Sequence, residues 1–382
     1  MDSFDDLTPN AIELARQAQA RGAGYIDLAS SNPTAHGLLY PAELLRAAAE
    51  PYWQARRYAP DPHGAPAARE AIAAYYAGRA PALPLSPDDL FITASTSEAY
   101  SLLFALLAEP GDNVLGPQVT YPLFEYLAAY HHVELRAYRM DEARGWAIDE
   151  EDLRAQADER TRAVLLVSPH NPTGHVVQSA LTALMELGVP VICDEVFAEF
   201  AYAVAGVPPL GVLMPDLPVF TLNGVSKMFA LPDMKLGWIA LTGPRAARDR
   251  FGPHLELLND TFLGANSLTQ AMLPALFAEG DAFRTGMRAR VRANLDHGLA
   301  RLGTSARVHV RPPEGGYYLF PEILDCADEE ALVIDLIRRG VLVYPGYFYN
   351  VEEGAHLMLA CLAEREIFAE GVERVMEGLR IA

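Results

Sequence analysis

The sequence has 382 residues, enough for two or three domains, and 51% of them are hydrophobic while 21% are charged. This composition is typical of a globular protein with a large buried core, and it excludes disordered and collagen-like chains. The formal net charge of −20 disfavours a nucleic acid or an anionic membrane surface as a partner.

Short apolar runs alternate with amphipathic helical patterns along the first part of the chain. The predicted strands are residues 90–93, 113–115, 133–137, 163–167, 189–193, 219–222 and 236–241. Helical patterns lie between the earlier strands, at 97–107, 123–130 and 180–187. This alternation indicates an α/β protein with a mostly parallel sheet covered on both faces. In such sheets ligands bind beyond the carboxyl ends of the strands.

The later part of the chain predicts a smaller set of elements. A long helix is expected over 268–301 and another over 329–339, with a final helix from Glu364. Short strands are expected at 308–310, 317–320 and 357–361. We divide the chain into an N-terminal segment (1–45) that packs with the small domain, a large domain (46–275) and a small C-terminal domain (276–382).

Cysteine usage and hydropathy indicate the cellular compartment of the protein. Cys193, Cys326 and Cys361 are too few and too scattered for a disulfide framework or a zinc site, and we interpret them as small buried apolar residues. The acidic N-terminus lacks the layout of a secretory signal. The longest uncharged stretch, 163–185, is interrupted by two prolines and a glycine, so it predicts no membrane span. We expect a cytoplasmic protein.

Lysine is nearly absent from this chain. Of the 30 lysine and arginine residues, only Lys227 and Lys235 are lysines. A desolvated lysine is the usual amine for Schiff-base chemistry, because burial lowers its pKa and frees the nucleophilic form. An isolated lysine is most often a solvated surface charge. Here the other cations are arginines, which favours a chemical role for Lys227, directly after a predicted strand.

Three further polar segments follow predicted strands. Asp194 ends the apolar run 189–193, where a carboxylate can pair with a protonated pyridine nitrogen, cap a helix or form a structural ion pair. The segment 168–174, SPHNPTG, is by itself a turn signal. The segment 93–98, TASTSE, joins a strand to a helix. Its N–H groups and hydroxyls can bind an anion, although ordinary N-capping would use the same residues.

In this order these motifs resemble those of the class I/II aminotransferases, which are fold-type-I pyridoxal-phosphate enzymes. The resemblance covers nearly the whole chain and rests on YIDL at 25–28, NPTG at 171–174, DEV at 194–196, SK at 226–227, KLGW at 235–238, PEGGYY at 313–318 and YPG at 344–346. It implies a large domain with a mostly parallel seven-stranded sheet and a smaller α/β domain built from both chain ends. It also implies pyridoxal 5′-phosphate as cofactor and transfer of an amino group between an amino acid, or a related amine, and a 2-oxo acid.

The resemblance also implies roles for individual residues. Lys227 would hold the cofactor as a Schiff base and shuttle the substrate proton, with Asp194 on the pyridine nitrogen and Tyr121 stacked on the ring. Asn171 would hydrogen-bond the phenolic oxygen of the cofactor. The phosphate would be held by Thr96, Ser97, Ser226, Lys235 as a buried cation, and Tyr58 of the partner subunit. Sharing Tyr58 implies a homodimer with shared active sites.

The sequence departs from the family pattern at four positions. A tyrosine that commonly donates to the phenolic oxygen is replaced by Phe197, an arginine at the phosphate by Lys235, and a phosphate-binding serine by Gly224. The arginine that usually binds the substrate carboxylate is replaced by Met358. We therefore expect weak activity with aspartate and glutamate, and a preference for apolar or aromatic amino acids or for amines without the carboxylate. Other groups that could line the pocket are Tyr318, Tyr344, Tyr347, Tyr349, His36 and Arg311.

Two other functions stay open. The same cofactor supports β-elimination, as in a C–S lyase, because the bond cleaved depends on its alignment with the ring. A cofactor-binding regulatory module without turnover is the second alternative. Such modules usually follow a DNA-binding domain, whereas this sequence starts almost at once with the enzyme pattern.

Overall fold

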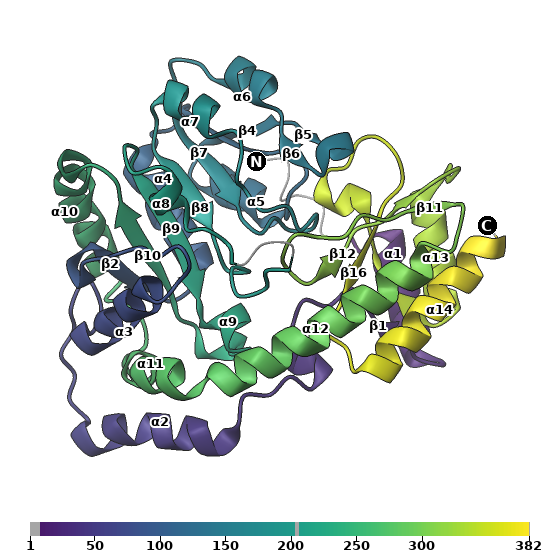
Figure 1. Ribbon diagram of the computed structural model, residues 1–382, viewed down its shortest axis with the longest axis horizontal. Helices are drawn as coiled ribbons and strands as arrows, with labels where there is room; N and C mark the ends of the chain where they lie inside the picture. Colours follow the sequence, from purple (N-terminus) through teal and green to yellow (C-terminus); the bar gives the residue numbers. More distant parts are fainter. Residues whose placement is uncertain (1–7, 203–205, 382) are drawn as a thin grey trace.

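The computed structural model describes residues 8–202 and 206–381, which form two lobes joined along one side (Figure 1). The larger lobe is built on a seven-stranded sheet of order β2-β10-β9-β8-β7-β3-β4. The strands are β2 (Leu90–Thr93), β3 (Asn113–Pro117), β4 (Glu134–Tyr138), β7 (Thr161–Val167), β8 (Val191–Asp194), β9 (Val219–Gly224) and β10 (Gly237–Thr242). All pairings are parallel except those of β10, which runs antiparallel to both neighbours. This confirms the predicted mostly parallel seven-stranded sheet.

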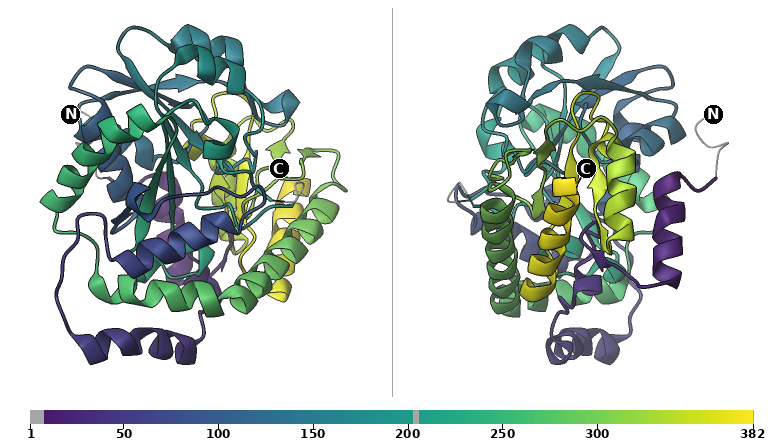
Figure 2. Two further views of the ribbon diagram at one scale, coloured as in Figure 1. Left: turned by 60° about the vertical axis from the view of Figure 1, so that its left-hand side comes forward. Right: turned by 90° about the vertical axis from the view of Figure 1, so that its right-hand side faces the viewer.

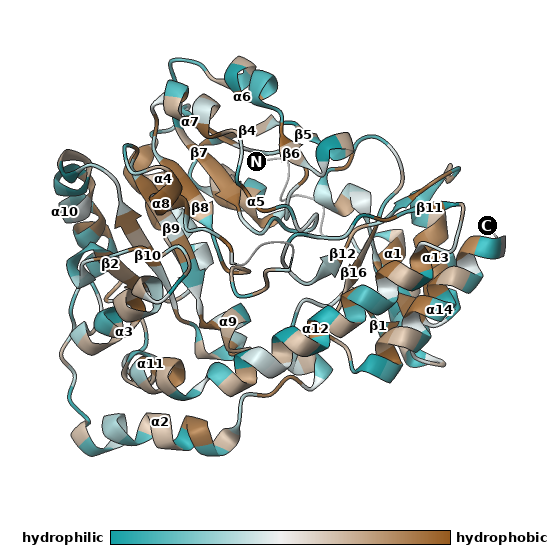
Figure 3. Ribbon diagram, in the orientation of Figure 1, coloured by the Kyte–Doolittle hydropathy of each residue, from teal (hydrophilic) through white to brown (hydrophobic). Residues whose placement is uncertain are grey.

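Helices cover both faces of this sheet, and its central strands are strongly hydrophobic (Figure 3). The helices on one face are α4 (Thr96–Leu107), α5 (Leu123–Tyr130) and α10 (Arg245–Thr261). Those on the other face are α6 (Glu150–Gln156), α7 (Leu181–Leu187) and α8 (Leu210–Leu213), while α2 (Ala42–Ala55), α3 (Pro66–Ala77) and α11 (Ser267–Glu279) cover the β2–β10 end. Burial on both faces explains why the strands read as continuous apolar runs.

The smaller lobe combines both ends of the chain. Its helices are α1 (Ala11–Arg21), α12 (Asp281–Leu302), α13 (Glu329–Arg338) and α14 (Arg365–Ile381). Its short strands are β1 (Ile26–Asp27), β11 (Val308–His309), β12 (Tyr318–Leu319), β13 (Glu322–Ile323), β14 (Val341–Leu342), β15 (Tyr344–Pro345) and β16 (Leu357–Ala360). β1 pairs in parallel with β14, so the N-terminal segment is part of this lobe's framework.

The prediction of a single long helix over 268–301 is wrong, because two helices cover this range. The structure breaks it at Gly280 into α11 and α12. A Cβ at Gly280 would lie 2.4 Å from the carbonyl oxygen of Leu276 and 2.7 Å from the ring of Phe229. α12 then crosses from the base of the large lobe to the small lobe. Figures 1 and 2 both show this crossing. The predicted boundary at residue 276 falls inside α11.

In the part of the chain that the structure describes, no helix combines the length and the apolar character that a membrane crossing needs.

Candidate active site

The site residues come together because neighbouring strands end at the same edge of the large sheet. β7, β8 and β9 are parallel neighbours, so Asn171 after β7, Asp194 at the end of β8 and Lys227 after β9 share this edge. β10 runs the other way, and its first residue, Gly237, therefore lies opposite Gly224 at the same edge. Motifs far apart in the sequence thus meet beyond the carboxyl ends of the strands, as predicted.

Asp194 is a buried carboxylate with ordered hydrogen bonds. Its Oδ2 accepts from the Tyr100 hydroxyl at 2.8 Å, and its Oδ1 accepts from the Val196 backbone N–H at 2.9 Å. Burial raises the pKa of Asp194 to about 6, although the two hydrogen bonds and the positive charge of Lys227 act in the opposite direction. A carboxylate held in this way is poised to receive a further cationic partner.

Lys227 lies on the short helix α9 (Val225–Met228), which begins where β9 ends. Its Nζ donates to the backbone carbonyl of Ser31 at 3.2 Å and lies 6.0 Å from the centroid of the Tyr317 ring. Burial lowers the pKa of Lys227 from 10.5 to about 8, and the charge of Asp194 opposes that shift. At neutral pH roughly one tenth of this amine is unprotonated, so a nucleophilic population is present.

Asn171 presents an unsatisfied amide at the same edge. Its Oδ1 is buried and has no hydrogen-bond partner among the described residues. Buried polar atoms in folded proteins nearly always have partners, so an exception needs an explanation. A bound molecule that completes the hydrogen bonding of Asn171 supplies one.

The segment after β2 forms a donor-rich corner beside Lys227. Ser95 is the N-cap of α4 and accepts from the Glu98 N–H at 3.1 Å, so the N-capping alternative is correct for Ser95. Thr96 and Ser97 are the first two helical residues, and a Cβ on Gly237 would lie 3.0 Å from the Thr96 nitrogen. The helix N-terminus and the start of β10 are therefore in close contact. Such a terminus attracts an anion.

Lys235 was predicted to be a buried cation at the phosphate, and in the single chain its side chain is not buried. This lysine ends the turn η5 (Pro232–Met234) in a left-handed conformation with φ of 48°. The turn carries Lys235 to the open side of the corner, where solvent reaches it. Ser226, also predicted at the phosphate, is half-buried on α9.

Two predicted aromatic residues are also exposed. Tyr121 precedes α5 with 46% of its surface accessible, and the neighbouring Thr120 N–H donates to the Tyr349 carbonyl at 2.9 Å. Tyr58, with 69% accessible, lies in the segment between α2 and α3, which runs along the outside of the large lobe (Figure 1). Within one chain, the structure brings Tyr121 toward the small lobe and leaves Tyr58 on the surface.

The small-lobe side of the site is aromatic. Phe197 packs edge-on against Tyr317, with ring centroids 4.9 Å apart, and against Tyr318 at 5.6 Å. The Tyr317 hydroxyl donates to the Ser31 carbonyl at 2.9 Å, the same oxygen that accepts from Lys227. The position of the missing tyrosine is therefore filled by a phenyl ring, while the Tyr317 hydroxyl and the Lys227 amine share the Ser31 carbonyl as acceptor.

Met358 is buried in the apolar core of the small lobe, on β16 opposite Tyr344 of β15. Among the other pocket candidates, the Tyr347 hydroxyl donates to Glu330 at 3.0 Å, and the His36 Nε2 lies 3.1 Å from the Ser30 carbonyl. Arg311 keeps a buried Nε without a partner among the described residues. Arg311 is thus the candidate with an unused donor.

Sequence reasoning missed two contributors to the site. Tyr100 donates to Asp194 from one turn inside α4, where a hydroxyl on an otherwise apolar helix face was the available signal. Ser31 contributes its backbone carbonyl to Lys227, and no side-chain pattern could have indicated that contact.

Comparisons with known proteins agree with this geometry. The family model described as aminotransferase class I and II matches residues 23–370. An alanine aminotransferase of Mycobacterium tuberculosis is 28% identical over 374 residues, which cover 94% of this chain and 87% of that protein. A probable aminotransferase of Arabidopsis thaliana is 31% identical over 323 residues, covering 81% of this chain and 71% of that protein. The solved alanine aminotransferase of Pyrococcus furiosus superposes with a TM-score of 0.89 at 25% identity, covering 96% of this chain and 95% of that one.

Proposed function

This chain belongs to the class I and II aminotransferase family and is a pyridoxal-phosphate-dependent aminotransferase, and from that premise we propose that it acts as a homodimer on apolar or aromatic amino acids, or on amines that lack the carboxylate. The single observation that supports the substrate class is Met358, a buried thioether in the apolar core of the small lobe, at the position where the family commonly has an arginine.

The residues at the sheet edge fit the cofactor. Pyridoxal phosphate supplies an aldehyde, a basic ring nitrogen that acts as an electron sink when protonated, a phenolic oxygen and a phosphate dianion. Lys227 has the lowered pKa that an amine needs to bind the aldehyde, and Asp194 is the buried acceptor that would keep the ring nitrogen protonated. Asn171, at the same edge, would donate from its amide N–H to the phenolic oxygen.

The remaining proposed contacts surround these three residues. Thr96 and Ser97 at the start of α4, together with Ser226 and Lys235, would hold the phosphate. Tyr121 would stack on the ring. Lys227 is the base that would move the proton on the substrate α-carbon. The Ser31 carbonyl and the Tyr317 ring are in contact with the Lys227 amine and orient it.

Discrimination against dicarboxylic substrates follows from what lines the small-lobe side. An arginine fork holds a carboxylate through two charge-assisted hydrogen bonds, each worth about 1.5–3 kcal/mol. Met358 cannot replace that fork. The aromatic rings of Tyr317, Tyr318 and Phe197 instead offer apolar surface, which selects by shape. Arg311, with its unused donor, is the group we assign to an α-carboxylate when the substrate has one.

A homodimer would explain why two predicted contacts are exposed. Tyr58 and Tyr121 lie on the surface of the single chain. A second subunit covering this open side would bring its own Tyr58 to the phosphate corner. The free thiols of Cys193, Cys326 and Cys361 accord with a reducing compartment, so we place the dimer in the cytoplasm.

A half-reaction screen tests the substrate class. The purified protein loaded with cofactor is mixed with each amino acid and with simple amines, and the absorbance of the lysine-bound cofactor is followed. Conversion by apolar and aromatic donors at rates well above those of aspartate and glutamate is expected. Fast, saturable turnover of aspartate would overturn the proposal, and release of ammonia without a 2-oxo acid acceptor would indicate β-elimination.

A further inference from the structure

Two histidines and a glutamate lie in a cross-strand row on the small lobe, away from the residues assigned above. His309 of β11 is the direct partner of Glu322 in β13, and Glu322 is in turn bridged to His356, just before β16. Directly opposed residues on antiparallel strands point to the same face, with Cβ atoms about 4.5–5.5 Å apart. The row therefore gathers two imidazoles and a carboxylate on one face.

The large lobe adds a second carboxylate to this row. Glu142 lies in the 3-10 turn η4 (Glu142–Arg144) of the hairpin formed by β5 (Met140–Asp141) and β6 (Ala147–Ile148). Trp146 of this hairpin packs on His356, with ring centroids 5.7 Å apart, which fixes the hairpin against the small lobe. Ligand atoms of Glu142, His309 and Glu322 all lie within 4.8 Å of one another.

The charges of this group are not balanced by permanent cations. The ion-pair partners of Glu142 and Glu322 in the described part of the chain are histidines: His356 Nε2 lies 3.2 Å from Glu142, and His309 Nδ1 lies 3.4 Å from Glu322. Two carboxylates and an imidazole this close together form an arrangement that a divalent cation stabilises.

His356 supports Glu142 from the small lobe. It is 1% exposed, and its Nε2 lies 3.2 Å from Glu142 Oε1. Metal-binding carboxylates are characteristically supported by such a second hydrogen-bonding residue.

We propose that Glu142, His309 and Glu322 bind one divalent transition-metal ion of the zinc class, with water as the fourth ligand and His356 positioning Glu142. Mixed nitrogen and oxygen donors suit zinc, whereas magnesium and calcium prefer oxygen donors alone. Tetrahedral zinc places its ligand atoms about 3.4 Å apart, so the half-exposed side chains need to draw in by about 1 Å. The bound ion would join the β5–β6 hairpin of the large lobe to the small lobe.

Calorimetric titration of the cofactor-loaded protein with zinc chloride tests the site, in a buffer without chelators and after removal of excess cofactor. The expected result is one zinc ion per chain and no comparable binding of magnesium chloride. His309→Ala and Glu142→Gln should each weaken zinc binding at least about tenfold, the lower end of the loss seen even for supporting residues. Diffraction data collected at the zinc edge should place the ion between these side chains.

The matched control is His254→Ala, because His254 is an exposed histidine on α10, whose Nδ1 contacts the Arg250 carbonyl. This variant should bind zinc as the unchanged protein does. His309 is 44% exposed, so its replacement leaves the core intact. Absence of stoichiometric zinc binding, or equal affinity in the control and in both ligand variants, would overturn the proposal.

Discussion

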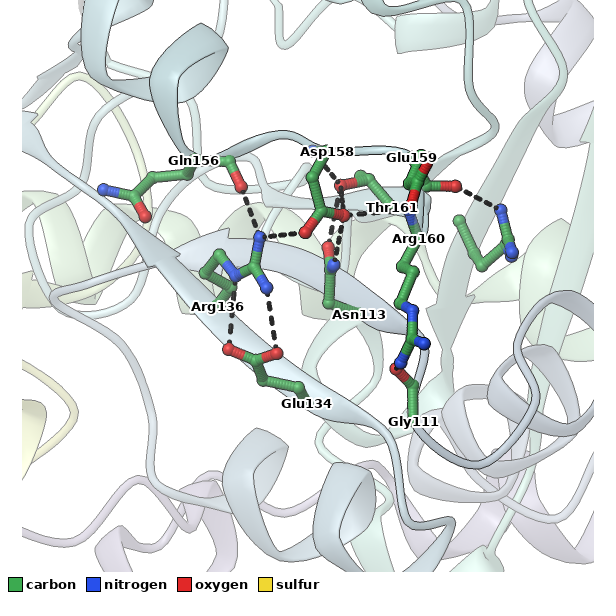
Figure 4. A network of polar contacts seen from close by, with 10 residues as sticks. Gly111, Asn113, Glu134, Arg136, Gln156, Asp158, Glu159, Arg160 and Thr161 are labelled. Carbon is green, nitrogen blue, oxygen red and sulfur yellow. Dashed lines mark hydrogen bonds and ion pairs between the residues drawn. The ribbon is translucent and has the colours of Figure 1, made fainter.

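The two edges of the large sheet carry opposite kinds of polar chemistry. At the amino ends of the parallel strands, Asn113 accepts from Thr161 and donates to Asp158 at 2.8 Å each, and Arg136 binds both Asp158 and Glu134 (Figure 4). Hydrogen bonds, first of all from Arg136, hold the pKa of Asp158 well below its ordinary value. Glu134, Arg136 and Asp158 thus each face an oppositely charged partner.

At the carboxyl-end edge, polar groups have pKa values shifted toward their neutral forms or lack a hydrogen-bond partner among the described residues. Asp194 has a raised pKa, Lys227 a lowered one, and Asn171 has a buried acceptor without a partner in the described chain. The amino-end network is complete in itself and stabilises the fold, whereas the carboxyl-end residues are completed by something that the chain does not contain. Perturbed and unsatisfied groups in one place are the physical mark of a functional site.

The largest effect is expected from replacing Lys227 at the carboxyl-end edge, which tests whether this edge carries out catalysis. Lys227→Ala should abolish transamination, with a loss of at least about 10²–10⁴-fold, because the proton-transferring amine is removed. Borohydride reduction and peptide mapping of the unchanged protein should locate the cofactor on Lys227, and the variant should release its cofactor on dialysis. A labelled peptide containing Lys235 instead would contradict the assignment.

The second prediction uses pH to probe the same edge. Lys227 must be unprotonated to bind the cofactor covalently, and its pKa is about 8. The rate of covalent cofactor uptake by the cofactor-free protein should therefore rise about tenfold per pH unit below 8 and level off above it. Stopped-flow absorbance measures this rate. A rise that continued to pH 10 would mean that the amine keeps its ordinary pKa.

The third prediction compares the replacement of two buried tyrosines, Tyr100 and Tyr138. Tyr100→Phe removes a hydrogen bond to a charged carboxylate, worth about 1.5–3 kcal/mol, so cofactor affinity should fall about tenfold or more. The pKa of Asp194 should rise further, which isotope-edited infrared spectra of the cofactor-free protein can detect. Tyr138→Phe is the control, because the Tyr138 hydroxyl donates to the Leu165 carbonyl at 3.0 Å. It should lower stability without changing cofactor affinity.

The fourth prediction moves to the amino-end edge. Asn113→Ala removes the acceptor at 2.8 Å from the buried Thr161 hydroxyl, which keeps the Asp158 N–H as donor, and it removes a donor to Asp158. We expect a loss of about 1–3 kcal/mol in the free energy of unfolding, measured by urea denaturation, with cofactor affinity unchanged. A loss of cofactor affinity at unchanged stability would erase the distinction between the two edges.

The smallest effect is expected at Lys235. Its side chain is exposed in the single chain, and exposed ion pairs contribute about 0–1 kcal/mol, so Lys235→Ala should weaken cofactor retention only a few-fold. The difference should shrink at high salt, because exposed charges are screened. A much larger, salt-independent loss would show that a partner subunit buries this lysine.

The sequence allowed the large sheet and most of its site to be predicted, for a physical reason. Strands buried on both faces are readable as apolar runs, and the topology of a parallel sheet brings whatever follows them to one edge. Gly280 was not recognised as a break, and its close approach to the ring of Phe229, a residue distant in the sequence, cannot be read from a local pattern. The exposure of Lys235 and the Ser31 contact depend on backbone paths that side-chain patterns do not encode.

Because α11 and α12 meet at Gly280, a rotation of α12 at that residue would move its far end. α11 packs against α2 and α3 in the large lobe, whereas α12 packs against α14 and β12 in the small one. The 22 residues of α12 span about 33 Å, so a rotation of about 5° at its base displaces its far end by about 3 Å. Because α12 packs on β12, which carries Tyr318, a rotation at Gly280 would carry that ring with it.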